Sequence, residues 1–148
     1  MRFVLAFALA TLAVSPAALA ATDKVLDGRE ITALQAKAAQ AAPKEQCFLY
    51  AELVHSMTQL ASQQLSAGDT AKASASLKAV QMYAEKIHMG VADDAKKLKN
   101  AEILMRHTAY MLKELTMGAS LDDRPTLEST LKQLDQVQSE MMMQVFKH

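Results

Sequence analysis

The stretch of sequence that decides the fold is residues 45–88, which read EQCFLYAELVHSMTQLASQQLSAGDTAKASASLKAVQMYAEKIH. Apolar residues recur there three and four positions apart, and this spacing places them on one face of an α-helix. They are Tyr50, Leu53, Val54, Met57, Leu60, Ala61 and Leu65 before the turn, and Ala73, Leu77, Val80, Ala84 and Ile87 after it. The stretch therefore predicts two amphipathic helices whose apolar faces can pack together.

A short turn at residues 67–70 joins these two predicted helices. Gly68 can adopt the left-handed conformation that ends a helix, and Asp69 or Thr70 can accept a hydrogen bond from the first N–H groups of the next helix. A connection this short makes the two helices antiparallel. We therefore predict a helical hairpin over residues 45–88.

The turn of this hairpin resembles that of a tetratricopeptide repeat. The resemblance is carried by the run GDTAKA at residues 68–73, by Met57, Leu60 and Ala61 before it, and by Leu77 after it. The sequence departs from the family at Gln64, where the repeat usually has an aromatic residue, and no proline closes the unit after Ile87. The resemblance implies a helix–turn–helix unit.

A similar pattern of residues recurs in the second half of the chain. A shift of fifty residues aligns Ala51 with Ala101, Thr58 with Thr108, Leu65 with Leu115 and Gly68 with Gly118, and a shift of fifty-four aligns Leu77 with Leu131 and Lys78 with Lys132. These identities fit an internal duplication of the hairpin, and they also fit the apolar periodicity that any two amphipathic helices share.

Residues 1–20 have the layout of a secretory signal peptide. Arg2 gives a positive start, residues 3–14 form an apolar run, and the ALA sequence at residues 18–20 is a small-residue cleavage site. The apolar run is shorter than the roughly 20 residues that a membrane-spanning helix needs, and no later stretch is long and apolar enough. We therefore expect residues 21–148 to be exported as one helical domain, to the periplasm or out of the cell.

The rest of the exported chain predicts three more helices. The first runs from about residue 27 to 41, the fourth from Asp93 to Gly118, and the fifth from Asp122 or Asp123, with Pro125 in its first turn, to Val145. No segment shows the alternation of a β-strand. We predict an all-α fold, either a five-helix antiparallel bundle or two stacked helical hairpins with a leading helix. The leucines at the centres of the apolar faces are Leu60, Leu77, Leu112 and Leu131.

Composition and motifs argue against several classes of function. Basic and acidic residues balance at sixteen each, whereas a nucleic-acid partner needs a clustered positive surface. The sequence has no paired-cysteine metal site, no haem-attachment CxxCH, no HExxH, no glycine-rich phosphate loop and no nucleophile elbow. We therefore expect neither an enzyme nor a bound cofactor.

Methionine is the one unusual feature of the composition, with ten in the sequence. Thioether sulfur suits Cu(I), and a Met with a His can also ligate haem iron inside a helical bundle. The best candidate pair is His107 with Met111, because residues four apart are adjacent on a helix face. The alternative is that these methionines fill the core, where their flexible side chains pack well.

The single cysteine and the second helix's histidine have simpler interpretations. Cys47 cannot form an intrachain disulfide and lies close to an apolar stripe, which predicts a buried structural thiol; a link between two chains is the alternative. His55 lies off the main stripe, near Phe48, and is expected to be a partly exposed surface residue.

The leading hypothesis is a non-catalytic, exported interaction or scaffold protein. Apolar residues that the main stripes do not account for could be covered by a protein or peptide partner, or by a second copy in a homodimer. These candidate partner-binding residues are Phe48, Leu49, Tyr110 and Phe146. The rival hypothesis is a periplasmic copper or haem binder that uses His107 and Met111.

Overall fold

The computed structural model of the chain describes residues 24–88 and 95–147. Within these ranges there are five helices and no strand: α1 (Gly28–Gln40), α2 (Pro43–Ser66), α3 (Thr70–His88), α4 (Ala95–Gly118) and α5 (Arg124–Val145). None of these helices is long and apolar enough to cross a membrane. The predicted all-α fold of five helices is confirmed, whereas the expected signal peptide and the predicted cap Asp93 lie outside the described residues.

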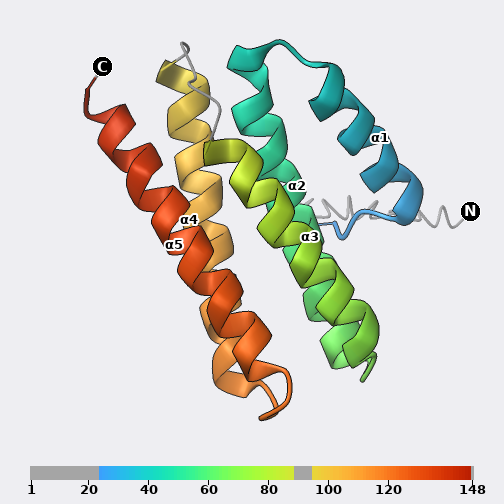
Figure 1. Cartoon of the computed structure of the whole chain (residues 1–148). Helices are drawn as coiled ribbons and strands as arrows, with labels where there is room; N and C mark the ends of the chain where they lie inside the picture. Colours follow the sequence, from blue (N-terminus) through green and yellow to red (C-terminus); the bar gives the residue numbers. More distant parts are fainter. Residues whose placement is uncertain (1–23, 89–94, 148) are drawn as a thin grey trace, which may run out of the picture.

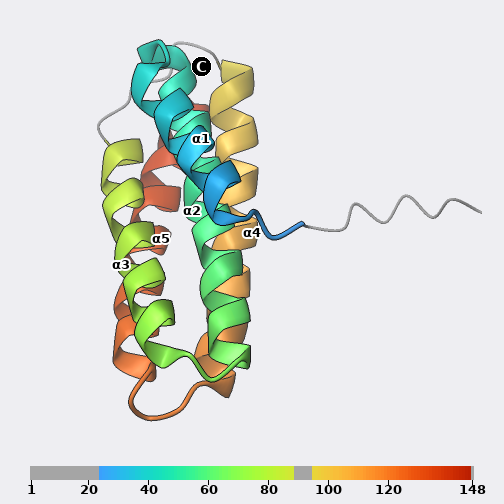
Figure 2. The same ribbon diagram turned by 90° about the vertical axis from the view of Figure 1, so that its right-hand side faces the viewer.

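Helices α2 to α5 form two hairpins that lie side by side (Figure 1). Helix α2 pairs with α3 and α4 pairs with α5, while α2 also contacts α4 and α3 also contacts α5. Neighbouring helices run antiparallel within a hairpin and parallel between the hairpins, as Figures 1 and 2 show. Of the two predicted packings, the bundle is therefore built as two stacked hairpins, with α1 added beside α2.

Local signals set the turn of each hairpin. Gly68 has a φ of 76°, and the Asp69 carboxylate accepts a hydrogen bond from the Lys72 backbone N–H at 3.3 Å, as predicted. In the second turn the Ser120 hydroxyl donates to the Asp123 carboxylate at 2.8 Å, just before α5 begins. Gly118, which aligns with Gly68 in sequence, ends α4 instead of adopting a positive φ. The two turns are therefore built differently.

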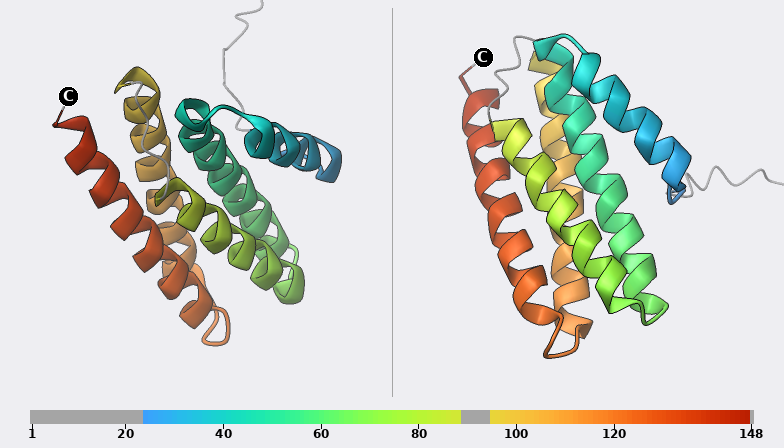
Figure 3. Two further views of the ribbon diagram at one scale, coloured as in Figure 1. Left: turned by 45° about the horizontal axis from the view of Figure 1, so that its top comes forward. Right: turned by 45° about the vertical axis from the view of Figure 1, so that its right-hand side comes forward.

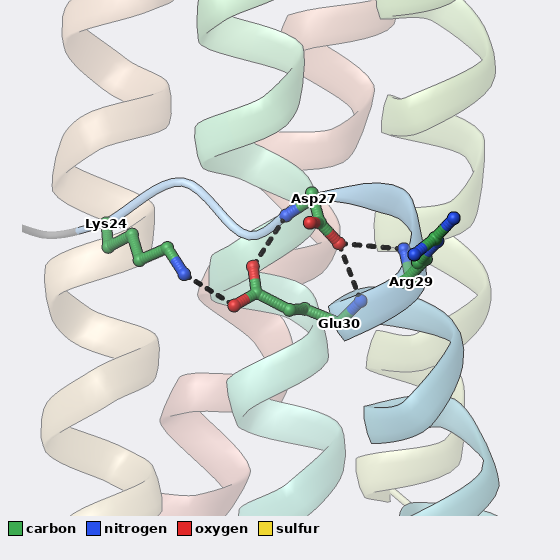
Figure 4. A network of polar contacts seen from close by, with 4 residues as sticks. All are labelled: Lys24, Asp27, Arg29 and Glu30. Atoms are coloured by element: carbon green, nitrogen blue, oxygen red, sulfur yellow. Dashed lines mark hydrogen bonds and ion pairs between the residues drawn. The ribbon is translucent and has the colours of Figure 1, made fainter.

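Helix α1 starts at a complete capping box. The backbone N–H groups of Arg29 and Glu30 each donate to the Asp27 carboxylate at 2.9 Å, and the Asp27 N–H donates to the Glu30 carboxylate at 2.9 Å (Figure 4). Lys24 forms an ion pair with Glu30. The exposed Lys24–Glu30 pair lowers the pKa of the Glu30 carboxyl below its usual value, chiefly through their hydrogen bond.

Helix α1 lies across α2 on the outside of the first hairpin, as both views in Figure 3 show. Its apolar side chains Ile31 and Ala38 are buried in the common core. The Gln35 side-chain amide donates a hydrogen bond to the Tyr83 hydroxyl on α3, so α1 is attached to both helices of that hairpin.

The core runs along the whole bundle, and two of the four predicted core leucines are at its centre. Leu77 and Leu112 are fully buried, whereas Leu60 and Leu131 are only partly buried. Leu60 lies on α2, of which the short helix α1 covers only a part. Leu131 borders a shallow depression between α4 and α5 on the outside of the second hairpin. A helical stripe is thus buried only where another element covers it.

Candidate functional site

A row of exposed apolar side chains follows α4 on the side away from the core. Ile103, Tyr110 and Met117 are 44%, 62% and 62% exposed and are seven residues apart. Seven residues are close to two turns of an α-helix, so the three side chains form one line. We call these three residues the α4 stripe.

Helix α5 extends this surface. A depression of about 380 Å³ lies between the two helices, with Met117 and Lys113 on the α4 side and Glu128 and Leu131 on the α5 side. Phe146, which is 82% exposed, follows Glu128 by eighteen residues, or five full turns, and so lies on the same side of α5. We call the α4 stripe together with this side of α5 the outer face.

The outer face carries a basic row on α4 and two acidic residues on α5, with the basic residue Arg124 at the start of α5. Helix α4 carries Lys99, Arg106 and Lys113, which are seven residues apart, and α5 carries Glu128 and Asp135, which have the same spacing. All five side chains belong to exposed residues. The outer face therefore has a positive edge on α4 and, beyond Arg124, a negative edge on α5, with apolar side chains among them.

The structure separates the four predicted partner-binding residues. Tyr110 and Phe146 are exposed on the outer face, whereas Phe48 is partly buried against the core. Leu49, predicted as a partner-binding residue, is only 5% exposed and so is not part of an open surface. Leu49 belongs to the same buried core cluster as Ile31 and Ala38 of α1, the helix that packs against α2.

A second concave region lies between α1, α2 and α4. This groove of about 630 Å³ is lined by side chains from all three helices, among them Leu34, Glu52, His55 and His107. Burial raises the pKa of the Glu52 carboxyl, and the positive charge of Lys37 lowers it by a smaller amount. The groove is a mixed apolar and polar surface with a partly dehydrated carboxyl group.

The groove brings together two histidines from different hairpins. The rings of His55 and His107 are tilted by 30° with centroids 5.4 Å apart. The Thr108 hydroxyl donates to the Leu104 carbonyl oxygen at 2.8 Å and also lies 2.8 Å from His55 Nδ1. Because the hydroxyl has a single proton, His55 Nδ1 donates to Thr108 in this arrangement. His55 is partly exposed, as predicted.

One member of the predicted soft-metal pair, His107, lines this groove. His107 is exposed and Met111 is partly buried one turn further along α4. Within residues 24–88 and 95–147, no group of three or more His, Cys, Asp or Glu side chains is placed to hold a metal ion. The sequence did not reveal His55 as the neighbour of His107, because the two residues are on helices that meet only through the stacking of the hairpins.

Cys47 is a buried structural thiol, as predicted. Its side chain is 1% exposed and belongs to the core cluster. Burial raises the pKa of the Cys47 thiol to about 11. The thiol is therefore both inaccessible and protonated at neutral pH.

Comparison of the chain with protein-family models, with curated proteins and with solved structures found no match. We therefore infer function from the residues and contacts of the chain itself.

Proposed function

We propose that this protein is a non-catalytic, exported interaction or scaffold protein that binds a protein or peptide partner through the outer face. The observation that carries the proposal is the α4 stripe, in which Ile103, Tyr110 and Met117 are exposed in one line. Aligned exposed apolar side chains are typical of interaction sites, and aromatic residues and Met are enriched there. Export is supported by the signal-like residues 1–20.

The shape of the outer face suits a helical partner. Anchors seven residues apart on a straight helix face can pack against a second helix with the same periodicity. Tyr110 is at the middle of the stripe and combines a large apolar ring with a hydroxyl group, so it is the expected main anchor. The charged rows beside the stripe supply orientation and partner selectivity.

A photo-crosslinking amino acid in place of Tyr110 tests this proposal. We expect it to form a covalent adduct with a protein partner in the native host, because the partner covers the middle of the α4 stripe. The measurement is the appearance of a heavier, light-dependent species, followed by mass spectrometry of the adduct.

The matched control carries the same amino acid in place of Met82. Met82 is also an exposed apolar residue, at 47%, but it lies on α3 and not on the outer face. Adducts from position 110 and none from position 82 support the proposal. Equal labelling from both positions, or none from 110, contradicts it.

A copper or haem binder is the second candidate, and the observation that favours it is the contact between the His55 and His107 rings. His107 and Met111 supply the sulfur and nitrogen ligands that Cu(I) or haem iron would need. A metal there would be held at the groove between α1, α2 and α4.

Titration of the purified protein with Cu(I) and with haem separates the two candidates. For an interaction protein we expect no stoichiometric binding, and we expect His107→Ala and Met111→Leu to leave the metal content unchanged. Met111→Leu should also cost less than about 1.5 kcal/mol, because the two side chains have similar volumes. Sub-micromolar binding in a fixed ratio that both substitutions weaken would instead establish a carrier.

A further inference from the structure

We infer that the partner on the outer face is a second copy of this chain. This inference rests on the proposed function, because it names the occupant of the same surface. It is carried by the opposite charges on the two edges of the outer face, which are complementary to each other in sign and in spacing.

The register of α4 and α5 places these charges at matching heights. The Gln138 amide donates to the Glu102 carboxylate at 3.4 Å, and Lys113 and Glu128 border one depression. Since the helices are antiparallel, this register also sets Arg106 level with Asp135.

Arg106 forms an ion pair within the chain, whereas the other three of these charges form none in its described part. In the described part of the protein, Arg106 approaches only Glu102, at 4.0 Å, and no ion pair joins Lys113, Glu128 or Asp135 to another residue. Lys113, Glu128 and Asp135 are therefore available to groups outside the chain, and Arg106, whose side chain is 60% exposed, can reach a second carboxylate besides Glu102.

A dimer with a two-fold axis parallel to the helices brings each charged row opposite the row of opposite sign on the second copy. Such an axis places α4 of one copy against α5 of the other and keeps every residue at its height. Arg106 then faces Asp135 of the second copy, and Lys113 faces its Glu128. The α4 stripe of each copy is covered at the same time. The other two-fold arrangement, with the axis across the helices, sets α4 against α4 and brings the basic rows together, which like-charge repulsion disfavours.

Sedimentation velocity of the exported chain tests this inference. We expect the wild-type protein to sediment at twice the chain mass at micromolar concentration. Arg106→Glu and Asp135→Arg should each weaken dimerisation by about tenfold or more, because each places like charges opposite one another. The two substitutions combined should restore the dissociation constant to within about threefold of the wild-type value, since the pair is re-formed with reversed signs. Lys78→Glu, an equal change of charge on exposed α3, should have no effect.

Tyr110→Glu provides an independent arm. It should weaken dimerisation by about 30-fold or more without changing the helical circular dichroism, because an interface anchor is lost while the core stays intact. A wild-type chain that is monomeric at about 100 µM overturns the inference. So does a dimer that persists in the Tyr110→Glu variant, or a failure of the combined Arg106→Glu and Asp135→Arg variant to regain dimerisation. A monomeric chain that still crosslinks from position 110 to another protein removes the second copy as partner and leaves the proposed function standing.

Discussion

Replacing Leu112 with alanine is expected to lower the free energy of unfolding by about 3–5 kcal/mol. Leu112 is 0% exposed and lies on α4, where both hairpins contribute to the core. The substitution removes buried methyl groups and leaves a cavity that the four packed helices can close only in part. Urea denaturation followed by circular dichroism measures the change, with an unaltered m-value showing that the same transition is being compared.

The matched control is Leu131→Ala, which makes the same chemical change at a partly buried position. Because Leu131 borders the depression on the outer face, water already reaches part of its side chain, and we expect a loss of only about 1–2 kcal/mol. Losses of equal size at the two positions would show that the packing of α4 differs from that described.

Local signals in the sequence were sufficient for the helices and for several of their ends, although Asp123 precedes α5 without a capping hydrogen bond to its side chain. The conformation of Gly68 and the cap at Asp69 act over a few residues, so the hairpin turn is readable from the chain alone. The same holds for the start of α1 at Asp27, whose carboxylate is satisfied by the N–H groups of its own helix. These features need no knowledge of the packing.

The candidate site was less predictable because exposure depends on what covers a helix. Leu49 and Tyr110 were both identified as apolar residues off the main stripes, yet Leu49 is buried in the core that α1 shares, whereas Tyr110 is 62% exposed. The position of α1 depends on contacts such as that between Gln35 and Tyr83, which are 48 residues apart. His55 and Thr108, 53 residues apart, were missed as a pair for the same reason.

The proposed internal duplication can be compared with the buried positions of the two hairpins. The buried positions of α3 and α5 match at the predicted shift of fifty-four, as in Ala73 with Leu127, Val80 with Leu134 and Ile87 with Met141. Those of α2 and α4 match at fifty-one instead of fifty, as in Cys47 with Leu98, Val54 with Met105 and Ala61 with Leu112. A shift of one residue moves a position by about 100° around the helix axis. At a shift of fifty, however, Ala51 and Ala101 are both fully buried, and so are Thr58 and Thr108, whose hydroxyls each donate to the carbonyl oxygen four residues before. The burial pattern of α2 and α4 is therefore compatible with either shift.

Cys47 is expected to react with a thiol reagent at least about a thousandfold more slowly in the folded protein than in urea. With a pKa of about 11, only about one Cys47 thiol in ten thousand is ionised at pH 7, against a few per cent for an ordinary thiol. Burial adds to this, because the reagent reaches the 1%-exposed side chain only when α2 opens. Mass spectrometry of the alkylated chain over time gives both rates.

A variant that combines Cys47→Ala with Gln63→Cys is the control. Gln63 is exposed on the same helix, so a cysteine thiol at this position should react as fast as a free thiol.

The alkylation rate of Cys47 also separates two kinds of dimer. If Cys47 is protected, a dimer seen by sedimentation is held by the outer face and persists in a reducing buffer, because a buried, protonated thiol does not exchange. Two results would contradict this expectation: rapid alkylation of the folded chain, or a dimer that dissociates on reduction. Either would mean that α2 opens far enough for Cys47 to form a disulfide between two chains.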